Sequence, residues 1–528
     1  MKKQTLLLVF VLHFFSLYAQ DTKSYYISGD TTWSSDTINV YNDIVVESQA
    51  TLYINPGVFV KFQGNYSLDI YGKIRAIGTS NDSIIFTIKD NTSFSDTTTI
   101  NGGWGGIRFF DNSADTSIFN YCRFSYGKAV DPGTFWGDPN NQDNMGGAIS
   151  AFGYSFLEIC NSSFYRNHAN YSGGGINVKN CLSIKLIDNT FKYNDVYFSG
   201  GGAYIKSTNY SFISGNIFVF NMAFHISSSG FSHGAGGGMS VYCNSKIYNN
   251  KFFNNKSVNG SLYESSYNSL ILGNIIANNW GPGFFGGWDN SISTLINNTI
   301  VNNLNYDPFG CGIFYFSKYM IMRNNIVYGN NSTWTSRDPI QIYSPLAITA
   351  NFAYSCNPDD YPGEGNIIDN PQFANPTEDT GPEYDGAAAD WSLLDSSPCI
   401  NTGTPDTTGL NLPETDILGN PRVYGIRIDM GAIENQMVVS LPKNALVNAS
   451  LEISPNPFGQ SFKVIAASNE KISSISLYNQ NGKLLGKLEN LPFDQLMVYD
   501  LANQPAGLYL MVTQFENGNV ESTKLVKY

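Results

Sequence analysis

Polar and apolar positions follow one fixed pattern that recurs seven times between residues 161 and 330. Each copy has Asn, Asp or Gly first and Asn or Ser second. A large apolar residue follows two positions later, and Asn follows three positions after that. The copies are NSSFYRN from Asn161, DNTFKYN from Asp188, GNIFVFN from Gly215, NNKFFNN from Asn249, GNIIANN from Gly273, NNTIVNN from Asn297 and NNIVYGN from Asn324. Successive copies are 24 to 34 residues apart, which is the length of one solenoid coil.

The pattern predicts a bend inside each copy. One apolar residue lies three positions before the second residue and another lies two positions after it, so a straight strand would place them on opposite faces. The first position holds only Asn, Asp or Gly, which enter the left-handed region most readily. We therefore expect two short strands joined by a tight turn, with the next Asn stacked on its equivalent in the following coil. The expected ladder is structural, since its amides satisfy buried backbone groups, and consists of Asn189, Asn216, Asn250, Asn274, Asn298 and Asn325.

A third strand in each coil is marked by Gly-Gly before an apolar residue. The marked residues are Ile107, Ile149, Ile176, Ala203 and Met239. Three short strands per coil without a helical apolar period predict an all-β chain, with a right-handed parallel β-helix solenoid followed by a small C-terminal antiparallel β-sandwich. Over roughly residues 100–350, the recurring FxxN and GGA[IL] motifs resemble those of the polymorphic outer-membrane protein repeats and of the pectin-lyase-like superfamily.

The N-terminal 19 residues are typical of a secretory signal peptide. Lys2 and Lys3 precede the apolar run from Leu6 to Phe15, and Ala19 stands at a plausible cleavage point. No other apolar run approaches the length of a membrane span. Residues 20–110 are expected to form the N-terminal cap and first coils, and residues 111–356 the repeats.

Residues 357–434 are expected to form acidic C-terminal coils and a cap. They contain 15 acidic residues against Arg422 and Arg427, so their net charge equals the −13 of the whole chain. The segments DWSLLDSSPCINTG and TDILGNPRVYGIRIDMGAIE resemble the choice-of-anchor Q segment that ends β-helix domains of surface proteins. The carboxylates form either a solvated acidic cap or a calcium site, and their spacing is not that of a calcium loop.

A linker at 435–450 precedes a domain at 451–528 with alternating strands and Asn-Gly turns. The domain contains the segments Pro455-Asn456-Pro457, Gly507-Leu508-Tyr509 and Lys524-Leu525-Val526-Lys527. With these segments it resembles the type A sorting domain of the type IX secretion system. The resemblance implies export to the outer-membrane surface or beyond, with the translocon and its sorting peptidase as partners. The resemblance also implies that the sorting signal is carried by Pro455, Asn456, Pro457, Gly507, Leu508, Tyr509 and Lys524.

Composition narrows the possible partners and cofactors. An acidic chain is a poor match for nucleic acid, whose phosphates require basic clusters. The seven cysteines form no CxxC pair, and most are expected to be buried thiols. If any disulfide exists, the sequence favours Cys356 with Cys399. We expect no cofactor, apart from the calcium alternative.

No catalytic group is apparent in the repeats. Hydrolysis of glycosides usually needs two carboxylates placed together, but the acids between residues 146 and 330 do not share an offset in neighbouring coils. His225 and His233 lie in a long insertion, where they indicate either a weak metal site or a mobile polar loop.

Binding residues are predicted in the insertions instead. Phe135 and Trp136 lie in the loop 128–144, while Trp280 and Trp288 bound the sequence WGPGFFGGW. Their rings either stack on sugars or pack on the solenoid side. The sequence thus predicts a secreted or cell-surface adhesin or carbohydrate-binding scaffold. The alternative is a polysaccharide lyase or glycoside hydrolase with its site in an insertion.

Overall fold

The computed structural model describes residues 26–132, 141–206, 209–226, 232–287, 291–317, 319–345, 351–436, 451–466, 472–479, 483–489, 497–516 and 520–528. The expected signal peptide and residues 437–450 of the expected linker lie outside these ranges. The chain divides into two compact units, residues 1–436 and 437–528. Within the described ranges, no helix is long and apolar enough to cross a bilayer.

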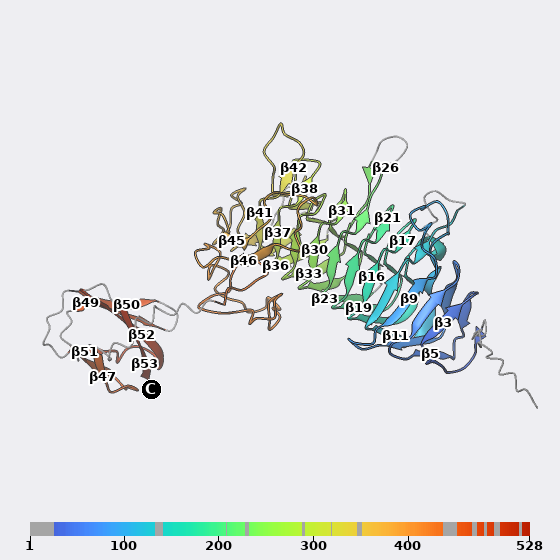
Figure 1. The fold of residues 1–528 in the computed structure, drawn as a ribbon. Helices are drawn as coiled ribbons and strands as arrows, with labels where there is room; N and C mark the ends of the chain where they lie inside the picture. The colour runs from blue at the N-terminus through green and yellow to red at the C-terminus, as the bar shows by residue number, and fades with distance from the viewer. Residues whose placement is uncertain are drawn as a thin grey trace, which may run out of the picture. The chain divides into compact units, whose positions relative to one another are not determined.

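The first unit is a parallel β-solenoid whose coils follow one another in chain order (Figure 1). Its walls are three parallel sheets of 12, 12 and 11 strands. The first sheet contains β1 (Tyr26–Ile27), β4 (Ile44–Val46), β7 (Ser67–Ile70), β10 (Gly106–Phe109), β14 (Ile149–Phe152), β18 (Ile176–Lys179), β22 (Ala203–Lys206), β28 (Met239–Val241), β32 (Leu262–Glu264), β35 (Phe284–Gly286), β39 (Ile313–Tyr315) and β43 (Ile342–Tyr343). The second sheet contains β2 (Thr31–Trp33), β5 (Thr51–Ile54), β8 (Lys73–Ile77), β11 (Asn112–Asn120), β15 (Tyr154–Cys160), β19 (Ser183–Ile187), β23 (Tyr210–Ser214), β29 (Ser245–Tyr248), β33 (Asn268–Leu272), β36 (Ile292–Ile296), β40 (Tyr319–Arg323) and β44 (Asn351–Ala353).

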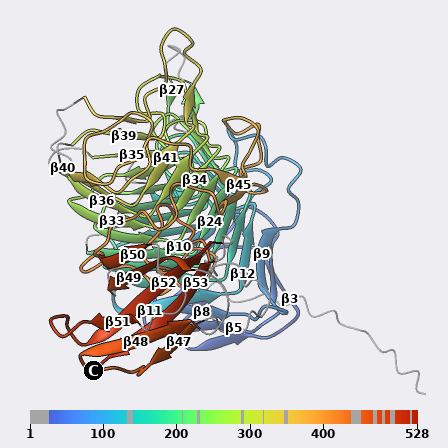
Figure 2. The ribbon, with the colours of Figure 1, turned by 90° about the vertical axis from the view of Figure 1, so that its left-hand side faces the viewer.

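The third sheet forms a separate wall, seen with the second sheet in Figure 2. It contains β3 (Thr37–Val40), β6 (Phe59–Phe62), β9 (Ile84–Ile88), β12 (Cys122–Ser125), β16 (Ser163–Tyr165), β20 (Thr190–Lys192), β24 (Ile217–Val219), β30 (Lys251–Phe253), β34 (Ile275–Ala277), β37 (Thr299–Val301) and β41 (Ile326–Tyr328). Short strands at the next corner form a five-stranded corner sheet and a further pair. They are β13 (Lys128–Ala129), β17 (His168–Ala169), β21 (Asp195–Val196), β25 (Met222–Ala223) and β31 (Lys256–Ser257), then β38 (Leu304–Asn305) and β42 (Asn331–Ser332). A short 3-10 helix spans Gln142–Asn144.

Identical positions of successive coils stack inside the solenoid. In the third sheet the inward rings of Phe124, Phe164, Phe191 and Phe218 lie parallel, with neighbouring ring centroids 4.7 Å apart. This distance matches the spacing of hydrogen-bonded strands. The apolar residue after each repeated Asn is therefore a core residue.

The turn between the second and third sheets is left-handed at the position that the sequence indicates. The φ angle is 54° at Asp188, 52° at Asn297 and 56° at Asn324. Each following Asn then bonds to the preceding coil: Asn298 Oδ1 accepts the backbone N–H and side-chain Nδ2 of Asn274 at 3.0 and 2.9 Å. Its own Nδ2 donates to the carbonyl of Ile271 at 2.9 Å.

A second asparagine row closes the other end of the third sheet. Asn194 Nδ2 donates to Asn221 Oδ1 at 2.8 Å, and Asn279 Nδ2 donates to Asn303 Oδ1 at 2.8 Å. The preceding residue is again left-handed, with φ 57° at Tyr193. The third sheet is thus fixed by amide rows at both of its borders.

The acidic segment consists of two parts in the structure. Residues 357–370 remain at the end of the solenoid, where Asp359 Oδ2 accepts the N–H groups of Gln341 and Ile342 at 2.7 and 3.0 Å. Residues 371–436, here named the return segment, run back along the outer face of the third sheet. This segment includes a short hairpin of β45 (Phe373–Asn375) and β46 (Asp390–Leu393).

The outer face of the third sheet explains this path. Its outward positions are polar in β16 and β20, but from β24 onward they are largely apolar and would be exposed without a cover. The covered residues of the third sheet include Val219, Phe253, Ile275, Ala277, Val301 and Ile326. The residues of the return segment that pack on them include Trp391, Leu393, Met430 and Ile433. Burial of this apolar surface therefore stabilises the return segment on the sheet.

The second unit contains two antiparallel sheets around its own core. One contains β47 (Leu451–Ser454), β48 (Ser461–Ala466) and β51 (Met497–Asp500). The other contains β50 (Leu484–Glu489), β49 (Ile472–Asn479), β52 (Gly507–Phe515) and β53 (Val520–Lys527). The alternating pattern of residues 451–528 forms the small antiparallel domain that it predicts.

Candidate functional site

The aromatic residues predicted to bind sugars are only partly described. Phe135, Trp136 and Trp288 lie outside the described residues. Trp280 is half-buried at the corner next to β31, where Lys256 Nζ lies 5.6 Å from its ring centroid and 4.5 Å from that of Phe224. Lys256 thus lies over the indole of Trp280 at this corner, and sugar binding by this ring stays a prediction.

A groove of about 650 Å³ lies on the outer face of the second sheet. Strands β23, β29, β33, β36 and β40 form its floor, and residues 409–411 of the return segment form one side. In β29, Ser245 and Ile247 are buried while Lys246 alternates outward. The residues in register with Lys246 in the next three coils are Leu270, Thr294 and Ile321, so the outward row that faces the groove is mixed, with polar and apolar side chains.

The lining of the groove combines cations and neutral hydrogen-bonding groups with the apolar side chains of Leu270, Ile296, Ile321 and Leu410. Lys246 and Arg323 supply positive charge, and no Asp or Glu is among the described residues that line it. The neutral groups are those of Asn209, Tyr210, Asn244, Asn268, Thr294 and Asn411. Within an acidic chain, this is a locally basic surface suited to anions and to hydroxyl-rich ligands.

Burial affects two groups at this site. It raises the pKa of Tyr210 to about 12, so its phenol stays neutral at physiological pH. Burial also lowers the pKa of Arg323, against the opposing effects of Tyr354 and Glu364. Arg323 Nη1 donates to the carbonyl of Met322 at 2.9 Å, which helps to hold the side chain.

The structure brings together a histidine and an aspartate whose contact the sequence does not predict. His168 and Asp195 are paired residues of β17 and β21, and His168 Nδ1 lies 2.6 Å from Asp195 Oδ2. His168 Nε2 lies 3.2 Å from Asn170 Oδ1, and its side chain is fully buried. His168 directly follows Asn167, and Asp195 directly follows Asn194, the equivalent Asn of the next coil. The shared position after this Asn is the sequence signal that places the two side chains side by side.

The histidine insertion lies near this pair. His225 and His233 face each other across the two-stranded hairpin of β26 (His225–Ile226) and β27 (Ser232–His233). The Tyr197 ring centroid lies 5.4 Å from that of His168 and 5.1 Å from that of His225. Across the described ranges, no three His, Cys, Asp or Glu side chains gather as a metal-binding group.

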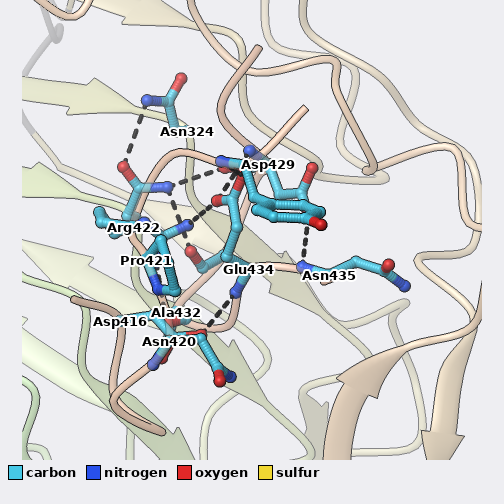
Figure 3. Close-up of polar contacts among 12 residues, drawn as sticks. Asn324, Asp416, Asn420, Pro421, Arg422, Asp429, Ala432, Glu434 and Asn435 are labelled. Atoms are coloured by element: carbon cyan, nitrogen blue, oxygen red, sulfur yellow. Dashed lines mark hydrogen bonds and ion pairs between the residues drawn. The ribbon is translucent and has the colours of Figure 1, made fainter. Parts of the chain in front are cut away.

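The acidic residues of the return segment form internal hydrogen bonds (Figure 3). Arg422 Nη2 donates to Glu434 Oε2 at 2.7 Å, with both side chains buried. Asp416 Oδ2 accepts the N–H of Glu434 at 3.0 Å, and Asp429 Oδ1 accepts the N–H of Asn401 at 2.6 Å. These donors occupy oxygens that a calcium ion would need, so the cluster fits a structural role better than an ion site.

Two of the three segments of the expected sorting signal are in contact in the second unit. Asn456 Nδ2 donates to the carbonyl of Lys524 at 2.7 Å, and its Oδ1 accepts the N–H of Val526 at 2.8 Å. The Pro-Asn-Pro segment is thereby joined to the last strand. Gly507 begins β52, where Leu508 is exposed and Tyr509 is buried.

A comparison with protein families agrees with the observed coils. A family model described as a right handed beta helix region matches residues 221–344. A solved structure, the crystal structure of pectate lyase Pel9A, is 15% identical, and the similarity covers 72% of this chain and 88% of that chain with a TM-score of 0.32. No curated protein matches. The chain is therefore an all-β protein with a right-handed parallel β-helix, followed by a small antiparallel domain.

Proposed function

We propose that this protein is a carbohydrate-binding surface scaffold and that the groove on the second sheet holds a saccharide chain bearing acidic groups. The observation that carries the proposal is the lining, which has Lys246 and Arg323 but no carboxylate among the described residues. Carboxylate or sulfate groups of a saccharide would pair with these cations. Amide and phenol groups would bond to its hydroxyls.

The groove is also shaped for a chain rather than for a compact molecule. It crosses five strands of successive coils, and strands of one sheet are about 4.8 Å apart. A polymer lying along the solenoid would meet equivalent side-chain positions in each coil. The bordering residues 409–411 would limit its sideways movement.

Binding to immobilised acidic and neutral polysaccharides tests the proposal. Lys246→Ala is expected to weaken binding of acidic polysaccharides about tenfold, the cost of one charge-assisted hydrogen bond. Lys185→Ala is the matched control, because Lys185 lies on the same sheet outside the groove, paired with Glu158 at 3.4 Å. Equal binding by wild type and Lys246→Ala, or no binding to any glycan, would contradict the proposal.

We also propose that the protein reaches the cell surface or the medium through the type IX secretion system. The expected signal peptide and the motifs of the second unit support this route, and its partners would be the translocon and sorting peptidase. In a host with this system, removal of residues 451–528 is expected to leave the protein in the periplasm. Normal release of the shortened chain would exclude this role of the domain.

A second candidate function is polysaccharide cleavage at the corner sheet. The contact of His168 with Asp195, close to the insertion that carries His225, favours it. Reducing-sugar and unsaturated-product assays across acidic and neutral polysaccharides test for turnover. Turnover that Asp195→Asn abolishes would replace the binding-only function, whereas turnover unchanged in that variant would exclude this site.

A further inference from the structure

Two buried thiols meet where the return segment packs on the end of the solenoid. Cys356 follows β44 and Cys399 lies in the return segment, 43 positions later. Both are completely buried members of the same apolar cluster. The thiol of Cys399 is a neighbour of Cys356 that raises its pKa, and the Cys356 thiol donates to the carbonyl oxygen of Asp369 at 3.2 Å.

The backbone holds both cysteines next to the same turn. The N–H of Cys356 donates to the carbonyl of Asn325 at 2.8 Å, which fixes it to the last coil of the third sheet. The carbonyl of Cys399 accepts the N–H of Met430 at 3.0 Å, and the N–H of Gly431 donates to the carbonyl of Asn324 at 2.7 Å. The thiols are therefore positioned by two ordered backbones rather than by chance contact of mobile side chains.

We propose that Cys356 and Cys399 form a disulfide bond that fastens the return segment to the solenoid, with a small-molecule disulfide as the oxidant. One thiolate attacks a sulfur of this oxidant and expels its first thiol, leaving a mixed disulfide on the protein. The second cysteine attacks that bond and expels the other thiol. Two cysteine thiols and one donor disulfide thus give one protein disulfide and two donor thiols, so atoms and electrons balance.

The surroundings determine when this bond forms. The neighbouring thiol and burial raise the pKa of Cys356, so little thiolate exists while the segment is docked. Oxidation is therefore expected during folding, or during local opening of the return segment. Once formed, the bond is shielded from reductants by the apolar cluster.

The test compares reduced and oxidised full-length protein of the same sequence. The reduced chain is held with oxidised glutathione at a mildly alkaline pH, then digested without reduction and analysed by mass spectrometry. We expect a linked peptide pair containing Cys356 and Cys399 that has lost two hydrogens. We also expect a higher melting temperature that reverts on reduction, because the bond restricts the unfolded chain.

Cysteine variants provide the matched controls. Cys399→Ser is expected to abolish the linked pair and the shift in melting temperature. Cys311→Ser, which changes another buried thiol whose Sγ faces the carbonyl of Pro308 at 3.5 Å, is expected to leave both intact. The proposal would be overturned by glutathione adducts without a linked pair, by a linked pair between other cysteines, or by an unchanged melting temperature. Each of these results can be obtained with the wild-type protein, without any variant.

Discussion

At the scale of single residues, the repeated asparagines join coils through both ends of the amide. The oxygen of each accepts the backbone N–H of the preceding ladder Asn, and the nitrogen donates to a strand carbonyl of that preceding coil. Since these groups are buried, water cannot replace a missing partner. Such a position tolerates few other side chains, which explains its regularity in the sequence better than ligand binding does.

Asn298→Ala is expected to lower the free energy of unfolding by about 3 kcal/mol, since it leaves the N–H of Asn274 and the carbonyl of Ile271 without partners. Urea unfolding followed by circular dichroism measures the loss. Asn55→Ala, at an exposed position, serves as the control and should change stability by less than about 0.5 kcal/mol. Equal effects of the two substitutions would show that the ladder is not required.

At the scale of elements, the return segment is fixed by an apolar interface and by one buried ion pair. Its residues cover the outer face of the third sheet, and Arg422 with Glu434 holds its final turns together. A buried ion pair adds little relative to an apolar replacement, but removing one partner leaves an uncompensated charge. The segment should therefore be sensitive to single changes at this pair.

Arg422→Ala is expected to destabilise the return segment by about 3 kcal/mol, because Glu434 remains buried without its cation. Limited proteolysis should then cut within residues 371–436 faster than in wild type. Arg166→Ala, which removes an exposed arginine beside the ring of Tyr165, is the control and should not change the cutting rate. Unaltered proteolysis of Arg422→Ala would show that the apolar contacts alone retain the segment.

The same cluster makes stability depend on pH. Burial raises the pKa of Glu434 to about 7 and that of Asp429 to about 6. The folded protein therefore holds these protons more tightly than the unfolded chain, and this stabilisation is lost as pH rises through 6 and 7. We expect the melting temperature to fall by roughly 5 °C between about pH 5 and pH 8.

Differential scanning fluorimetry across this pH range shows whether the melting temperature falls or rises with pH. Asp429→Asn removes one of the two titrating groups and should make the decrease less steep. A melting temperature that rises with pH over the same range would contradict the expected effect of burial.

At the scale of the whole molecule, the chain consists of two units with separate cores. The solenoid has a groove on its second sheet and a covered outer face on its third, so the proposed binding surface is restricted to particular walls. All the residues named as lining the groove belong to the first unit. Binding and export are therefore proposed for separate parts of the chain.

Removal of residues 437–528 is expected to leave the melting temperature of the solenoid within about 2 °C, because each unit has its own core. Scanning calorimetry of the full and shortened chains measures this directly. A lower melting temperature of the remaining unit would show that its stability depends on the C-terminal domain.

The sequence predicts the repeating parts of this molecule much better than its singular parts. Turn residues such as Asp188 and core residues such as Phe191 recur at fixed offsets, so local chemistry repeated over coils indicates the solenoid. The return segment has no repeat, and its position depends on apolar surface presented by strands far earlier in the chain. The groove escapes prediction for the same reason, because Lys246 and Asn411 meet only through that tertiary packing.

Three asparagines of the solenoid bond to the return segment, and these bonds depend on the register of the coils. Asn254, Asn278 and Asn302, from three successive coils, donate in turn to carbonyls of Tyr384, Gly381 and Thr377 at 2.7, 3.2 and 3.5 Å. These donors are in line only when every intervening coil is present and in register. Docking of the return segment thus depends on the correct number and register of the coils. In a chain with a slipped or missing coil, the return segment would not dock.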